Sequence, residues 1–266
     1  MKLGWPFWAG ASFLAFLAVL AILGPTMRHH YLEPAAQPFL EPSAQFWLGT
    51  DEQGRDLFAR LAFGARMSLF IGVTVQAIAL LVGIVVGVAG VFAPKWIAGP
   101  VMRLTDAMFA FPDILLAILI IGIVGMGFLP VVIALSVTAW PPVARLVMTQ
   151  CRALKEREFV VASRALGSPT LPLVRGHVLP HVWSVLLAVS MVELAGTILS
   201  ESALSFLGIG VQAPDPSWGS MINVGRSELQ SHPMVLFWPC LALSLSIFAL
   251  NFLGDALRER SDPRNR

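Results

Sequence analysis

The chain has 266 residues, of which 56% are hydrophobic and 13% are charged, and its formal net charge is +2. Soluble domains carry about 25% charged residues, and a soluble fold of this length could not cover so much apolar surface. Stretches of about 20 apolar residues, long enough to cross a hydrocarbon core of about 30 Å, recur along the sequence. The composition therefore excludes an ordinary soluble protein and predicts an all-α, polytopic helical membrane protein.

Six transmembrane helices are predicted from these apolar stretches. The first span, within residues 1–25, is expected to stay uncleaved, because its apolar core is longer than the 7–15 residues of a signal peptide. An extracytoplasmic segment follows at 26–66, and five spans make up residues 67–266 together with a polar loop at 150–181. The six spans are expected at residues 4–24, 67–93, 105–125, 129–148, 182–204 and 234–253.

The extracytoplasmic segment begins with a proline-rich stretch and ends in a helical pattern. Thr50 or Asp51 is expected to cap this helix. Residues 57–62 place apolar side chains on one face, which predicts an amphipathic helix lying on the outer membrane surface. Three carboxylates, Asp51, Glu52 and Asp56, surround Arg55. Their spacing fits no calcium loop, so helix capping and salt bridges are favoured over a metal site.

Catalytic motifs are missing from the sequence. The lysines complete no P-loop, and H-E-x-x-H, C-x-x-C and G-x-S-x-G do not occur. The adjacent His29 and His30 are interpreted as incidental, and Cys151 and Cys240 are expected at different depths, where they cannot pair. We therefore predict no catalytic residue and no metal site in this chain.

The distribution of basic residues predicts the orientation in the membrane. With six spans, both termini and the loops at 94–104 and 149–181 lie on one side, which holds thirteen of the 18 Lys and Arg residues. By the positive-inside rule this side is cytoplasmic. The five basic residues on the opposite side are Arg28, Arg55, Arg60, Arg66 and Arg226.

The polar loop from Arg152 to His181 is the most informative segment. It contains a short helical pattern in which four residues share one face at spacings i, i+3, i+4 and i+7. Gly167 is expected to end this helix in a left-handed conformation, and Ser168–Pro169 prevents its continuation. A helix with small residues on one face can seat in a partner's groove. The four residues are Phe159, Ala162, Ser163 and Leu166.

Three acidic residues are predicted within or at the ends of spans, where polar side chains are expensive and often functional. Glu193 and Glu201 lie in the fifth span, eight residues apart and so on roughly the same side of a helix. Asp113 lies in the third span. Each could line a translocation pathway or gate, or each could serve packing through a hydrogen bond to another helix.

Several motifs, taken in order, resemble one family of membrane proteins. Residues 161–167, V-A-S-R-A-L-G, followed after eleven residues by Leu179–Pro180, resemble the EAA coupling loop of permease subunits of bacterial ABC importers. Further motifs are similar to the second permease subunit of the dipeptide, oligopeptide and nickel branch. The resemblance covers residues 49–263, and these further motifs lie at residues 49–56, 201–214, 218–223 and 251–258.

The resemblance implies a type I ABC importer permease fold and a division of labour. This subunit would form a heterodimer with a homologous permease in the bacterial cytoplasmic membrane. Two ATPase subunits would bind ATP and Mg²⁺ and each grip one coupling loop, and an extracytoplasmic binding protein would deliver the substrate. The chain itself would bind no cofactor. The residues expected to couple to the ATPase are Glu158, Phe159, Ala162, Ser163, Leu166, Gly167, Leu179 and Pro180.

The sequence departs from the family pattern at the coupling loop. Val161 stands where the family usually has Glu, and Ser163 where it usually has Ala; Glu193 and Asp113 also differ from the usual residues. Di- or oligopeptides are the first expectation for the substrate, and nickel or a metal–chelate complex is the second. A different class, a secondary transporter or channel with these carboxylates as ion sites, would not explain the capped basic loop.

Overall fold

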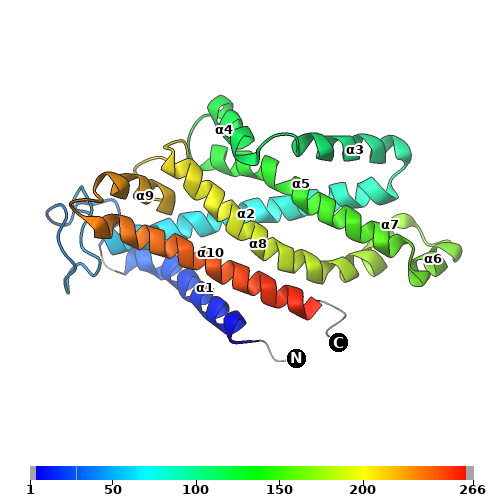
Figure 1. Cartoon of the computed structure of the whole chain (residues 1–266), viewed down its shortest axis with the longest axis horizontal. Coiled ribbons are helices and arrows are strands. Elements are labelled where there is room, and N and C mark those ends of the chain that lie inside the picture. Colours follow the sequence, from blue (N-terminus) through cyan, green and yellow to red (C-terminus); the bar gives the residue numbers. More distant parts are fainter. Residues whose placement is uncertain (1–3, 28, 262–266) are drawn as a thin grey trace.

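The computed structural model describes residues 4–27 and 29–261, so Lys2, Arg28, Arg264 and Arg266 of the charge count lie outside the described residues. In this part of the chain the regular structure is helical, and β-pairing is limited to two isolated bridges. Most of the long helices run along one axis (Figure 1). The helices are α1 (Trp5–Leu23), α2 (Leu57–Phe92), α3 (Lys95–Met108), α4 (Asp113–Val124), α5 (Phe128–Lys155), α6 (Glu158–Ala165), α7 (Thr170–Leu173), α8 (Leu179–Phe206), α9 (Trp218–Ser227) and α10 (Pro233–Ser261), with short turns at Gly24–Thr26 and Val174–Val178.

Five helical segments are long and apolar enough to cross a membrane, and the pair α3 and α4 makes a sixth if it is counted as one span. The segment Thr170–Phe206 counts once, because α7, the turn at Val174–Val178 and α8 follow one another without a break. The predicted all-helical, six-span architecture is therefore confirmed in outline. The boundaries of two segments differ from the prediction in ways that matter for the site.

The prediction of one continuous third span at residues 105–125 is wrong. α3 begins ten residues earlier, at Lys95, and α4 leaves it at an angle of 94°. Pro112 explains the break: it lacks an N–H and disfavours helical backbone at the preceding residue, and its own ψ of 126° is extended. Asp113 therefore begins a new helix at a bend in the membrane-spanning region.

The prediction of a separate amphipathic helix at residues 57–62 is also wrong. These residues form the first turns of α2, a continuous helix of 36 residues that is about 54 Å long. The cap is Asp56, whose carboxylate accepts hydrogen bonds from the N–H groups of Phe58 and Ala59. Thr50 instead bonds to the backbone of residues 37 and 40 in the preceding loop.

Glycines allow α2 to pack closely against two neighbours. A Cβ added at Gly83 would lie 2.6 Å from Cβ of Val143 in α5, and one added at Gly72 would lie 2.8 Å from Cγ1 of Ile198 in α8. Small residues of this kind let membrane helices approach without a hydrophobic driving force between them. The close packing of α2 on α5 and α8 therefore depends on glycine at these positions, where a larger side chain would clash.

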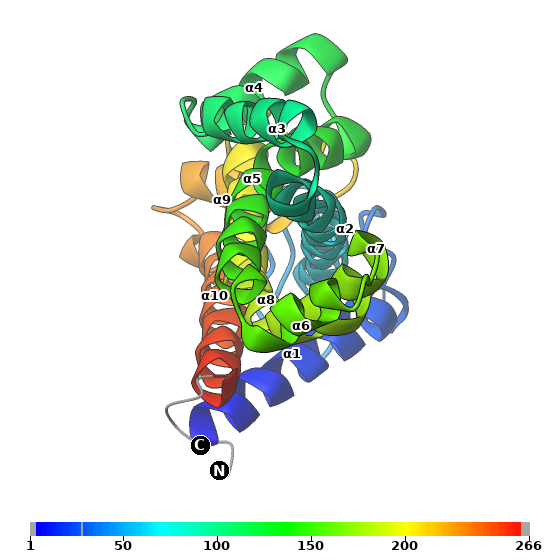
Figure 2. The same ribbon diagram turned by 90° about the vertical axis from the view of Figure 1, so that its right-hand side faces the viewer.

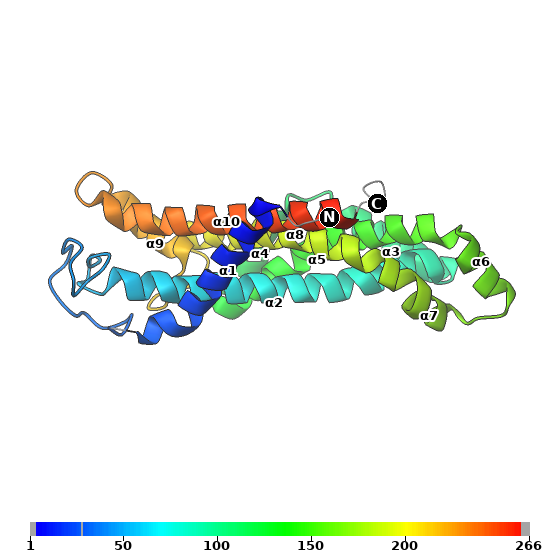
Figure 3. The same ribbon diagram turned by 90° about the horizontal axis from the view of Figure 1, so that it is seen from below.

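The two ends of the bundle differ. α6 and α7 project at one end, and α9 with residues 29–56 covers the other (Figures 1 and 3). α1 crosses the outside of the bundle obliquely (Figure 2) and packs on α10 and α2. α1 begins near the middle of the long axis, and α10 ends on the half that carries α6 (Figure 1). The projecting helix α6 and the segment that carries α9 therefore lie at opposite ends of the bundle.

Candidate functional site

Helix α6 has the boundaries and the cap that the sequence predicts. It covers Glu158–Ala165, and Gly167 has φ of 81°. The N–H of Gly167 donates to the carbonyl of Arg164 at 2.9 Å, and the N–H of Ser168 donates to the carbonyl of Ser163 at 3.1 Å. These bonds satisfy carbonyl groups that the end of a helix leaves free. The left-handed cap at Gly167 is therefore confirmed.

The predicted face of α6 is accessible. Leu166 is 88% exposed and Phe159 is 36% exposed; Ala162 is exposed and Ser163 is half-buried. Val160, which points to a different side, is completely buried in a cluster with residues of α5 and α8. The helix is thus anchored through one side and presents the small-residue face outward.

Side chains tie α6 and its flanks to two spans. The guanidinium group of Arg164 lies 5.3 Å from the ring centroid of Phe92 at the end of α2. The ring of Phe159 stacks on the ring of His181 in the first turn of α8. Lys155, just before α6, donates to the carbonyl of Val91 at 3.3 Å. A displacement of α6 would therefore change its contacts with both α2 and α8.

The predicted Leu179–Pro180 pair lies at the start of α8. Leu179 closes the π turn Val174–Val178 by donating its N–H to the carbonyl of Val174. Pro180 occupies the first turn of the helix, where its missing N–H costs least. Leu179 is half-buried and Pro180 is exposed. The pair thus lies where the π turn passes into α8, which begins three residues before the predicted span.

A large open cavity lies beside α6. It has a volume of about 1190 Å³ and is bounded by residues of α5, α6, α8 and α10. Its wall combines apolar side chains with charges of both signs. The polar residues that line it are Gln150, Glu156, Arg157, Glu158, His181, Ser184 and Arg258.

Glu201 has no exposed surface, a property that it shares with the capping residue Asp56. Its oxygens accept hydrogen bonds from the hydroxyl groups of Ser68 in α2 at 2.9 Å and Ser205 in α8 at 2.8 Å. Ser202 is a weaker partner at 3.4 Å. This is the geometry of the packing interpretation, in which the carboxylate joins two spans.

The same cluster holds the outer loop in place. Ser205 accepts the N–H of Val211 at 3.1 Å, and Ser217, which also lies against Glu201, caps α9 in a reciprocal capping box with Ser220. Gly219 packs so tightly that an added Cβ would lie 2.1 Å from the carbonyl oxygen of Ser202. Glu201 therefore connects α2, α8 and the segment leading into α9.

Asp113 and Glu193 form a separate group. Asp113 is exposed at the start of α4 and Glu193 is half-buried in α8, and the two carboxylates are close enough to repel each other. Neither makes a hydrogen bond or an ion pair through its side chain to any residue of the described chain. The structure thus brings Asp113 and Glu193 together, whereas Glu201 has its own partners, Ser68 and Ser205.

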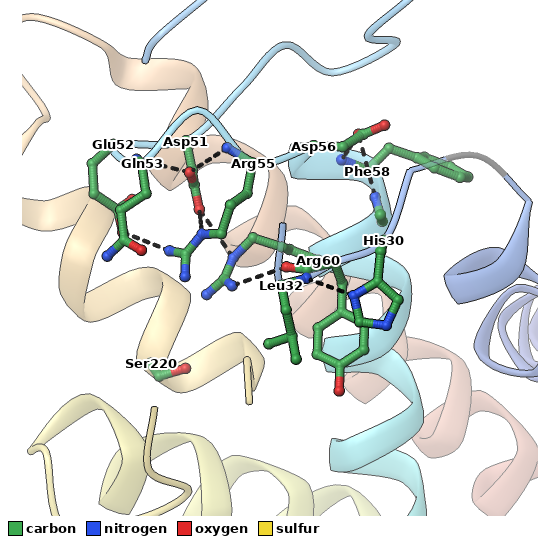
Figure 4. A network of polar contacts seen from close by, with 12 residues as sticks. His30, Leu32, Asp51, Glu52, Gln53, Arg55, Asp56, Phe58, Arg60 and Ser220 are labelled. Atoms are coloured by element: carbon green, nitrogen blue, oxygen red, sulfur yellow. Dashed lines mark hydrogen bonds and ion pairs between the residues drawn. The ribbon is translucent and has the colours of Figure 1, made fainter. Parts of the chain in front are cut away.

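The outer segment is held by a charged network that the sequence only partly predicted. Figure 4 shows Asp51 between two arginines: its carboxylate lies 2.7 Å from Nε of Arg55 and 3.1 Å from Nε of Arg60. Arg55 also donates to Glu52 at 2.8 Å. The expected salt bridges are confirmed, whereas the participation of Arg60, from the first turn of α2, needed the fold.

Sequence reasoning missed Ser68 and Trp218. Trp218 has no exposed surface, and its indole N–H donates to the carbonyl of Leu61 at 3.2 Å, which fixes α9 against α2. Ser68 lies in an apolar span with no signal other than its polarity. Its partner, 133 residues away, could be found only from the packing of α2 on α8.

These features define a class: a polytopic helical membrane protein with a capped, projecting helix at one end and a polar network at the other. Residues 79–266 match the family described as binding-protein-dependent transport system inner membrane component. The chain belongs to this family. The resemblance that the coupling-loop and outer-loop motifs indicated is therefore confirmed.

Relatives match over most of the chain. It is 38% identical to the dipeptide transport system permease protein DppC of Bacillus subtilis (strain 168), over 97% of this chain and 82% of the relative. It is 38% identical to the di/tripeptide transport system permease protein DppC of Pseudomonas aeruginosa (strain UCBPP-PA14), over 96% and 87%. The glutathione transport system permease protein GsiD of Pectobacterium atrosepticum is 36% identical over 84% and 74%.

The fold has a solved counterpart. An inward-facing structure of the MetNI methionine ABC transporter matches with a TM-score of 0.62 at 21% identity, over 76% of this chain and 96% of that chain. At this identity the match concerns the fold alone. It confirms the predicted ABC importer permease fold.

Proposed function

We propose that the chain is one of two permease subunits of an ABC importer for di- or oligopeptides. The observation that carries this function is α6: a capped helix at one end of a membrane bundle, with its family-motif face exposed and its other side anchored in the core. Such a helix is suited to a partner's groove. Relatives named for dipeptides, di/tripeptides and glutathione favour peptides over nickel.

The division of labour follows from this role. A homologous permease would complete the pathway, two ATPase subunits would bind ATP and Mg²⁺, and an extracytoplasmic protein would deliver the substrate to the end that carries α9. This subunit would perform no chemistry and bind no cofactor. The α6 end, with both termini, would face the cytoplasm, as the excess of Lys and Arg on that side indicates.

ATP-driven closure of the ATPases would displace α6 and switch the pathway between inward-facing and outward-facing states by rigid-body movement. Asp113 and Glu193 support a role in the pathway, because unpaired carboxylates within a membrane protein are costly unless they face a water-filled space. The bend at Pro112 places Asp113 at a position that such movement would shift.

Co-purification and uptake test the proposal together. The tagged chain, expressed with its partner subunits, should retain an ATPase after detergent extraction. Cells containing the complex should take up a labelled dipeptide but not ⁶³Ni²⁺ when the binding protein is present. Uptake of nickel alone would overturn the peptide assignment, and a chain that binds no ATPase would overturn the importer role itself.

A further inference from the structure

The two ends of the polar loop meet at one aromatic contact. The ring of Phe159 in α6 stacks on the imidazole of His181 in α8, with centroids 5.0 Å apart and planes inclined by 20°. α7 and the π turn lie between these residues in the chain. Stacked rings at this separation attract each other beyond the effect of buried area. The contact therefore joins the docking helix directly to a membrane span.

His181 makes a second contact that fixes its ring. Its Nδ1 lies 2.7 Å from the carbonyl oxygen of His177, and because a carbonyl can only accept, Nδ1 carries the hydrogen and donates. His177 lies within the π turn Val174–Val178, a kind of turn often found at functional sites. Pro180, directly before His181, supplies no N–H to this part of the backbone. The imidazole is thus oriented by the turn and supports the ring of Phe159.

The stack stands at the edge of open space. Phe159 and His181 both line the cavity of about 1190 Å³ between α5, α6, α8 and α10. On the side of Phe159, α6 can move into the cavity without displacing packed side chains. On its other side, buried Val160 anchors the helix in the core. A contact at the edge of the cavity is well placed to carry a displacement of α6 into α8.

α8 can carry that displacement across the membrane. It is a single helix from Leu179 to Phe206, and its one proline, Pro180, lies in the first turn. His181 and Glu201 are separated by twenty residues, about 30 Å along the axis. A displacement of α8 at His181 would therefore also move Glu201 and change its contacts with α2 and the outer loop.

We propose that His181 is a positioning residue for coupling: through its stack with Phe159, it transmits movement of the ATPase-docking helix to α8. This inference rests on the proposed function and adds a specific link to it. Loss of the ring should leave ATPase binding and hydrolysis in place but weaken the transfer of movement. An aromatic contact of this kind corresponds to about a two- to tenfold change in the coupled equilibrium.

The experiment compares variants of the complete complex in proteoliposomes, with ATP hydrolysis and uptake of a labelled dipeptide measured together. His181→Ala and His181→Asn remove the ring and should lower the ratio of dipeptide taken up to ATP hydrolysed by about two- to tenfold. His181→Phe keeps a stacked ring and should restore the ratio. His177→Ala is the matched control, because it removes a neighbouring imidazole but leaves the carbonyl that His181 binds.

A swap of the pair separates stacking from docking. Phe159→Ala should lower the ratio, and Phe159→His combined with His181→Phe should recover it, because two rings still meet. Co-purified ATPase is measured for every variant. A normal ratio in His181→Ala, an uncoupled His181→Phe, or loss of the ATPase from the single His181 variants would each overturn the inference. Absence of the ATPase from the unaltered complex would instead refute the proposed function.

Discussion

Ser68 in α2 donates a hydrogen bond to Glu201 in α8 at 2.9 Å, although the two residues are 133 positions apart. The bond lies in a site with no exposed surface on either residue. Hydrogen bonds between membrane helices contribute about 0.6 kcal/mol on average and up to about 1.7 kcal/mol. The several hydrogen bonds to the Glu201 carboxylate therefore hold α2, α8 and the loop before α9 together.

Replacing Glu201 tests whether these hydrogen bonds stabilise the helix packing. Glu201→Leu would leave the hydroxyl groups of Ser68 and Ser205 without their acceptor, at about 1–3 kcal/mol for each stranded group. We expect a complex that still assembles but melts at lower temperature and transports less. Glu201→Gln, which keeps an acceptor oxygen and adds a donor, is the matched control and should retain most of both properties. Uptake and thermal unfolding of the purified complex measure the effects. Wild-type uptake and thermal unfolding in Glu201→Leu would show that Glu201 contributes to neither stability nor transport.

Ala162→Asp tests the docking face of α6. The side chain of residue 162 is exposed in the isolated subunit, so the variant should insert and fold. Against a partner's groove, an unpaired buried charge costs on the order of 2–5 kcal/mol, which corresponds to loss or uncoupling of the ATPase. Leu171→Asp is the control, because Leu171 is 76% exposed and lies in α7, outside the predicted docking face. Equal ATPase retention in both variants would show that this face does not dock.

Gly167 isolates the effect of the helix cap. An added Cβ would meet no atom within 4 Å, so only its φ of 81° opposes a side chain. Gly167→Val should distort the end of α6, at about 1–3 kcal/mol of backbone strain, and reduce ATPase co-purification. Gly167→Asn should be tolerated, because Asn enters the left-handed region more readily. Equal binding by both variants would mean that the cap does not shape the docking surface.

The outer charged network predicts different costs for two neighbouring carboxylates. Asp51→Ala would leave Arg55 and Arg60 buried without their shared partner, which for a buried pair costs about 3–5 kcal/mol. Glu52→Ala should cost about 0–1 kcal/mol, because the Glu52 side chain is 25% exposed and such pairs contribute little. Thermal unfolding of the two purified variants compares them. A larger loss of stability in Glu52→Ala would contradict the network as described.

Cysteine labelling tests the orientation. Arg55 would be a poor reporter of the exported side because it is 7% exposed, whereas Gln37 and Glu156 are both exposed at opposite ends of the bundle. In a background without Cys151 and Cys240, an impermeant maleimide should label Gln37→Cys in intact cells and Glu156→Cys only after lysis. Labelling of the second position in intact cells would reverse the topology.

Helix α6 and its cap could be predicted closely because their determinants are local. Gly167, Ser168 and Pro169 end α6 through their own backbone preferences, and the face with Phe159 and Leu166 follows from helical spacing. The salt bridges of Arg55 with Asp51 and Glu52 are equally local. These features depend on residues within about two helical turns of each other, so they do not depend on how the helices pack.

The third span and the outer helix could not be placed from the pattern. The apolar stretch around Pro112 reads as one span by length and hydropathy, but the proline makes a bend whose size depends on how α4 packs on α5. Residues 57–62 are amphipathic because they pack against α9 and α1, not because they lie on the bilayer. Hydropathy alone does not distinguish burial in protein from burial in lipid.

The sequence by itself determined that this chain spans the membrane, which end is rich in positive charge, and that a capped helix projects from that end. These properties depend on composition and on short-range order. Only the tertiary structure decided that Glu201 bonds to Ser68, that Asp113 lies near Glu193, and that Phe159 stacks on His181. Each of these contacts joins segments that meet only when the helices pack, because side-chain partners across a bundle are set by the register and close approach of whole helices.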